Sequence, residues 1–303
     1  MPVWLQLAAA LLAGLAAGIM GKAFIPFLRR ARWCEPLTKK QEDEEASGEQ
    51  LRPNLGGVLL CFGILAGISL GFALFQTAVR TELPEKEYLA GQKQLLLLLG
   101  QGGILALGGF IVDVLRIRRR LLYKVPLWMQ GLAVYLVTLG MQTALQEEPS
   151  LLRTLYVAVC WMLMQGMEET DGGMLAVGTV QLLCIAVLML AGMLYLPALY
   201  ALVCAGACMG CMVWCLHPAK CRFGSTGSFL LGGTVPLLLL MTQEWQACVL
   251  LMAVCLVNAL PRLLRRPSLD GSLAESGMQP LGRIAVFAGA AAVTGAATLL
   301  AVH

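Results

Sequence analysis

Charged residues are scarce in this chain of 303 residues: they make up 13% of it, whereas apolar residues make up 58%. A soluble domain carries about 25% charged and about 45–50% apolar residues. The shortage of charge excludes an ordinary water-soluble protein, and the excess of apolar residues excludes a disordered chain. The mean hydropathy of +0.76 points the same way. The composition therefore predicts an integral membrane protein.

The sequence also lacks the alternation of apolar and polar residues that marks the strands of a membrane barrel. It has instead about ten apolar runs close to the roughly 20 residues that a helix needs to cross the hydrocarbon layer. The runs cover residues 3–21, 55–75, 95–112, 126–145, 152–166, 173–190, 194–216, 227–242, 245–260 and 283–302. We predict an all-α, polytopic bundle of about ten transmembrane helices that forms one domain, residues 1–303.

No basic residue precedes the first run, and several follow it, which is the reverse of a secretory signal. With the N-terminus outside, eighteen of the 22 Lys and Arg residues fall on the inner side of the membrane. The positive-inside rule thus predicts that both termini face outward. This topology also accounts for the net charge of +4, so the basic residues do not indicate nucleic-acid binding.

A long soluble segment, an internal repeat and a charge in the middle of a span are all missing, and the last two absences disfavour a transporter. The longest polar segment, residues 35–52, carries the acidic run Glu42-Asp43-Glu44-Glu45. We expect it to be a mobile cytoplasmic loop without chemistry of its own.

Eleven cysteines are present, and four of them share one helical stripe: Cys204, Cys208, Cys211 and Cys215. The first three have the spacing of some iron–sulfur sites. The run is apolar and uninterrupted, and small residues at this spacing let helices pack closely. We favour packing over metal binding, and no disulfide framework is implied.

Four acidic residues lie at inner ends of the predicted spans: Asp113, Glu168, Glu169 and Asp171. An acid at a helix end can cap the next helix or pair with a neighbouring cation such as Arg116. Together, however, the acids facing the basic residues that follow Asp113 could hold Mg²⁺ and a diphosphate. Arg116 can likewise anchor the topology or form part of a phosphate-attracting rim. The residues leave these alternatives open.

A third inner segment, residues 217–228, separates the seventh run from the eighth. It offers two cations, three hydroxyls and two glycines before a helix that we expect to start at Gly227. Backbone N–H groups at such a start favour phosphate, although Ser225 or Thr226 could simply cap the helix. The candidate phosphate-binding residues are Arg116, Lys220, Arg222, Gly224, Ser225, Thr226, Gly227 and Ser228.

These segments resemble motifs of the polyprenyl-phosphate N-acetylhexosamine-1-phosphate transferases (glycosyltransferase family 4), especially the bacterial enzymes that transfer phospho-N-acetylmuramoyl-pentapeptide. Arg52–Gly57 is similar to Thr-Pro-Thr-Met-Gly-Gly, and Gly109–Arg116 to Gly-Phe-Ile-Asp-Asp-Tyr-Leu-Lys. Thr170-Asp171-Gly172 resembles part of Asn-Leu-Thr-Asp-Gly-Leu-Asp-Gly. Residues 217–233 resemble Tyr-Pro-Ala-Lys-Val-Phe-Met-Gly-Asp-Thr-Gly-Ser and the Leu-rich run that follows. Gln130 also matches a Gln of the span after the second motif.

The resemblance implies transfer of a sugar 1-phosphate from a UDP-sugar to undecaprenyl phosphate, with Mg²⁺, at a bacterial cytoplasmic membrane during peptidoglycan synthesis. Carried over by position, Asp113 and Asp171 would be catalytic and would hold the metal together with Glu168, and Lys220 would match the motif lysine. Relatives of this kind often form homodimers, so a homodimer is an expectation too.

The chain also departs from these motifs. Val112 stands in place of the first acid of the Asp pair, and Ser225 in place of the Asp before Thr-Gly-Ser. The paired-Asp loop lacks its second acid, and the family's His-rich stretch before the last span has no counterpart. Two hypotheses follow: an active transferase, or a catalytically silent relative that binds the lipid carrier, the nucleotide or a cell-wall synthesis partner.

Overall fold

The computed structural model describes residues 3–31, 33, 53–78, 85–119, 126–144, 150–169, 172–263 and 267–302. In these ranges the secondary structure is helical. The long helices are α1 (Val3–Arg30), α3 (Gly56–Ala78), α4 (Glu85–Arg119), α5 (Leu127–Ala144), α6 (Leu151–Gln165), α7 (Gly173–Ala191), α8 (Tyr195–Cys215), α9 (Gly224–Met241), α10 (Trp245–Leu263) and α12 (Pro280–Val302). Each coincides with one predicted run, so the all-α polytopic fold is confirmed.

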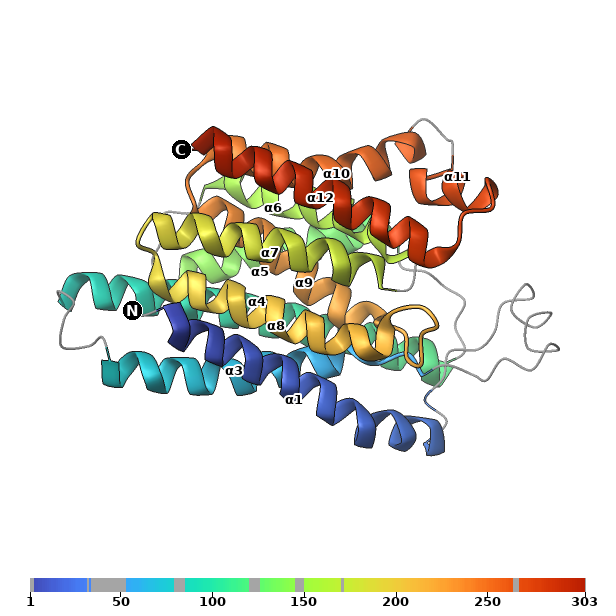
Figure 1. Ribbon diagram of the computed structural model, residues 1–303, viewed down its shortest axis with the longest axis horizontal. Coiled ribbons are helices and arrows are strands. Elements are labelled where there is room, and N and C mark those ends of the chain that lie inside the picture. Colours follow the sequence, from blue (N-terminus) through green and yellow to red (C-terminus); the bar gives the residue numbers. More distant parts are fainter. Residues whose placement is uncertain are drawn as a thin grey trace.

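Seven of these helices are long and apolar enough to cross a membrane, and α6 and α10 are apolar but shorter. Successive long helices run in opposite directions, and both chain termini lie at the same end of the bundle (Figure 1). This arrangement agrees with the prediction that the two termini face the same side. The opposite end holds the α8–α9 loop, residues 216–223, and is the end predicted to be cytosolic.

The element boundaries differ from the predictions at four places. The helix α1 extends nine residues beyond its apolar run, because Ile25 and Leu28 of its last turns are still buried. The helix α4 extends beyond 95–112 at both ends. Within the segment predicted as an irregular inner loop, Leu269–Glu275 forms the short helix α11. The helix α9 begins at Gly224, three residues before the predicted start.

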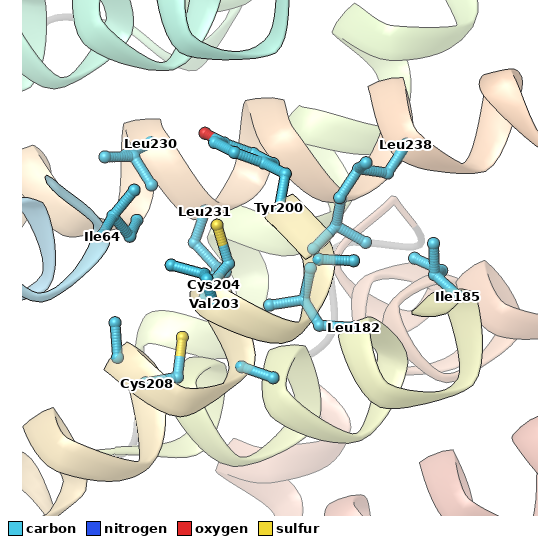
Figure 2. Close-up of a cluster of buried hydrophobic side chains, with 14 of the residues drawn as sticks. Ile64, Leu182, Ile185, Tyr200, Val203, Cys204, Cys208, Leu230, Leu231 and Leu238 are labelled. Atoms are coloured by element: carbon cyan, nitrogen blue, oxygen red, sulfur yellow. The ribbon is translucent and has the colours of Figure 1, made fainter. Parts of the chain in front are cut away.

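The centre of the bundle is α8, which packs against α1, α3 and α7. Its Cys204 and Cys208 lie in the buried apolar cluster with Leu182 of α7 and Leu231 of α9 (Figure 2). All four cysteines of the stripe are free and at most 1% exposed. Among the described residues, no group of three or more His, Cys, Asp or Glu could hold a metal ion. These observations agree with the packing interpretation of the stripe.

The acidic segment 35–52 lies outside the described residues, apart from none of its members. The prediction of a mobile loop there stays a prediction.

Candidate functional site

The α8–α9 loop is the point at which the motif segments meet. The backbone of the first motif pairs with it: the N–H of Gly56 donates to Arg222 O at 2.9 Å, and that of Gly57 to Phe223 O at 2.7 Å. The N–H of Arg222 donates in return to Pro53 O at 2.9 Å. Segments 170 residues apart in the chain are thereby joined at one end of the bundle.

Two glycines of the motifs let helices touch the first turn of α9 through their backbones. A Cβ on Gly57 would overlap the backbone of Gly227, and a Cβ on Gly109 would overlap that of Ser225. Any larger residue at either position would push α3 or α4 away from α9. The glycines therefore act here through close packing of helices.

Asp113 of α4 caps the first turn of α9. Its Oδ1 accepts the N–H of Ser225 at 2.9 Å, and its Oδ2 accepts the N–H of Thr226 at 2.9 Å and the Thr226 hydroxyl at 2.7 Å. The Asp113 side chain is fully buried. Gly224 precedes this turn with a φ of +74°, a value that favours glycine because it has no Cβ. A carboxylate at this position also stabilises the helix dipole of α9.

The cap of α9 thus comes from another helix. Of the two expectations for this segment, capping by Ser225 or Thr226 is wrong: the residue before α9 is Phe223, and no side chain of its own caps the helix. Asp113 already occupies the two N–H groups at the start of α9. The residues from Gly224 to Ser228 are buried as well.

The acidic turn (residues 168–172) reaches the same loop through its last residue. A Cβ built on Gly172 would lie 2.9 Å from a methyl group of Leu216 and 3.3 Å from Cys215 O. The short helix η1 (Gly166–Glu169) leads into this turn. Asp171 and the side chain of Glu168 lie outside the described residues, so their roles stay predictions.

The described residues do not fit a Mg²⁺ ion at Asp113. A Mg²⁺ ligand has to present a carboxylate oxygen to the ion, and both oxygens of Asp113 already accept hydrogen bonds inside the protein. A cation there would have to displace donors of α9 from a side chain with no exposed surface. Any metal held by the acidic turn would have to be held without Asp113 in this arrangement.

The candidate cations lie around the outer part of the loop. Lys220 is exposed, and its Nζ lies 5.3 Å from the centre of the Trp214 ring. Arg222 and Arg116 are half-buried. The hydrogen bond with Cys215 lowers the pKa of the Cys221 thiol from its ordinary value, although burial opposes this effect. The Cys221 thiol also donates to Pro53 O at 3.2 Å.

Sequence reasoning missed a second polar cluster at this end of the bundle. Asn258 of α10 donates to Gly166 O of η1 at 3.0 Å and accepts the N–H of Asp270 at 3.0 Å. Asp270 pairs with Arg283 of α12 at 3.1 Å. This brace (Asn258, Asp270 and Arg283) fixes α11 against η1. Its signal was a lone Asn near the end of an otherwise apolar run.

Fold and site together define a polytopic helical membrane protein whose motif segments gather on one loop at one end of the bundle. No protein-family model matches the chain. Curated relatives do match it. The chain is 27% identical to the phospho-N-acetylmuramoyl-pentapeptide-transferase of Shouchella clausii, over 88% of this chain and 83% of that protein.

The proteins of the same name from Halalkalibacterium halodurans and Bacillus licheniformis are each 26% identical to the chain. Each match covers 82% of this chain and 78% of the relative. The resemblance predicted from the motifs is thereby confirmed. The chain is a distant relative of the phospho-N-acetylmuramoyl-pentapeptide-transferases.

Proposed function

We propose that the chain works at the step for which its relatives are named, transfer of a phospho-sugar to the undecaprenyl phosphate carrier in peptidoglycan synthesis, and that it binds the participants without catalysing transfer. The step is supported by the similarity to the transferases over most of the chain. The substrates would be a UDP-sugar and undecaprenyl phosphate, at the inner face of a bacterial cytoplasmic membrane. The whole chain would act as one membrane domain.

The observation that carries the binding role is the burial of Asp113. It is the acid of the second motif that this chain retains, and its three hydrogen bonds hold α9 in place. The two neighbouring positions that would add acids are Val112 and Ser225. Three carboxylates are thus reduced to one, and that one has a structural task. Charge stabilisation of a phosphoryl transfer needs carboxylates that are free to hold the metal.

The test is a comparison of turnover with binding on the purified chain. Release of UMP from UDP-N-acetylmuramoyl-pentapeptide is measured with undecaprenyl phosphate and Mg²⁺, and binding of each substrate is measured by native mass spectrometry. We expect binding without UMP release. Turnover above the rate of a blank membrane preparation would refute the binding role. Absence of both activities would refute the assignment to this step.

An active transferase is the second candidate, and the convergence of all four motif segments on the α8–α9 loop favours it. In that case Asp171, with Glu168, would hold the Mg²⁺, and Lys220 and Arg222 would contact the diphosphate. The Asp171→Asn variant then separates the candidates, because it would abolish UMP release by an active enzyme. The matched control is Glu275→Gln on the exposed face of α11, which should change nothing.

A further test asks whether the scaffold lacks only its acids. The double variant Val112→Asp, Ser225→Asp restores two carboxylates at the motif positions. Gain of UMP release would show that the bundle still positions the substrates for transfer. A homodimer is part of the proposal, and light scattering in detergent measures it.

A further inference from the structure

Trp214 lies in a notch on α1 at the end predicted to be cytosolic. Its Nε1–H donates to Gly18 O at 2.9 Å, and a Cβ on Gly21 would overlap the indole ring. Two glycines one turn apart thus make room for the ring between α1 and α8. Tryptophan is typical of the boundary between hydrocarbon and head groups, because its ring is apolar and its N–H is polar.

Lys220 is placed on this ring by the backbone. Its N–H donates to Trp214 O at 2.9 Å, which folds the loop back over the end of α8. The ammonium group then lies 5.3 Å from the ring centre, within the range of a cation–π interaction, and the side chain is exposed. The positive-inside rule explains why a cation is present here, but not why it rests on a tryptophan at α1.

Arg29 approaches the same place from α1. It follows Gly18 by eleven residues, so it lies on the helix face that carries the notch. Its side chain is exposed. Its positive charge is one of the influences that lower the pKa of Cys221, the residue next to Lys220. Two cations and an aromatic ring therefore converge on one point of the α1 surface.

This point is separate from Asp113. The helix α1 packs against α3 and α8, whereas Asp113 belongs to α4, which packs against α9. The α8–α9 loop thus has an α1 side with the cations and an α4 side where Asp113 caps α9. On the α1 side, the membrane boundary supplies one abundant anion at this depth, the phosphate of a lipid.

We propose that Lys220 and Arg29, beside Trp214, bind the phosphate group of an anionic lipid at the cytosolic end of α1. The inference goes beyond the proposed function, because it holds whether or not the chain catalyses transfer. Phosphatidylglycerol and undecaprenyl phosphate share the required chemistry. A single bound phosphate would link α1 to the α8–α9 loop.

The test measures lipid retained by the full chain in native mass spectrometry, with phosphatidylglycerol, undecaprenyl phosphate and the zwitterionic phosphatidylcholine as probes. We expect Lys220→Gln and Arg29→Gln each to lower retention of an anionic lipid about fivefold, which corresponds to about 1 kcal/mol per cation near the surface. The matched control is Arg30→Gln, the exposed neighbour about 100° further around α1. It should have little effect.

The outcomes divide as follows. Preference for phosphatidylglycerol identifies bulk phospholipid as the occupant, and preference for undecaprenyl phosphate identifies the lipid carrier; both support the site. An equal loss in Arg30→Gln, or equal retention of phosphatidylcholine, would mean unspecific attraction and would overturn it. Displacement of the lipid by an equal concentration of inorganic phosphate would also overturn it. The UMP assay is independent of all these outcomes.

Discussion

Replacing Asp113 should destabilise the end of the bundle where the motif segments meet. The variant Asp113→Ala leaves three donors of α9 without their acceptor: two N–H groups and the Thr226 hydroxyl. Leaving a buried donor unsatisfied costs about 1–3 kcal/mol. Loss of a helix cap alone costs about 0.5–2 kcal/mol. Because the three bonds are made by one side chain and are not additive, we expect a total of about 3–5 kcal/mol.

The assay is thermal unfolding of the purified chain in detergent, followed by tryptophan fluorescence. At about 2–4 °C per kcal/mol, Asp113→Ala should lower the Tm by about 6–12 °C. Asp113→Asn should have about half this effect, since its amide retains one acceptor. The control Glu275→Gln, at an exposed acid of α11, should leave the Tm unchanged. An Asp113→Ala Tm equal to that of the control would refute the capping role.

Three further predictions follow from the same contacts. Gly109→Ala should destabilise the protein by about 1–3 kcal/mol because its Cβ meets the backbone of α9, whereas Gly108→Ala, whose Cβ meets nothing within 4 Å, should be neutral or stabilising; equal melting temperatures would contradict this. Arg283→Met should cost about 3 kcal/mol by leaving Asp270 without its partner, measured by the same melting assay, and Asp270→Asn in the same chain should recover part of the loss. Changing Cys204 and Cys208 to Ala should leave the chain folded at a cost of about 1 kcal/mol each, with no change in metal content by mass spectrometry; loss of bound iron would contradict the packing interpretation.

The ten long helices were predictable because each contains an apolar run, and hydropathy alone selects such runs. Helix ends were less predictable. The last turns of α1 carry Lys22, Arg29 and Arg30, which look like the start of a loop, yet Ile25 and Leu28 bury the other face. The short helix α11 was missed because its seven residues depend on the cap by Ser268 and on Asn258 for their stability.

The site was predictable in its segments and not in its contacts. The motifs correctly indicated which stretches of chain belong together, and the glycines within them mark the close approaches to α9. The partners of Asp113 are backbone N–H groups, which every residue except proline carries, so no residue type identifies them in advance. The seat of Lys220 was equally hidden, because it requires that Gly18 and Trp214 come together across 196 positions of the sequence.

The cap on α9 has a consequence for biosynthesis. Asp113 emerges from the ribosome 112 residues before Ser225, its later partner. While α5 to α8 are being inserted, the carboxylate must wait at the rim of the bilayer, where water can still solvate it at little cost. Withdrawal of that water and arrival of α9 are then one event. Assembly of this half of the molecule therefore finishes late, when its ninth decade of kilodaltons is already irrelevant and only the docking of one helix remains.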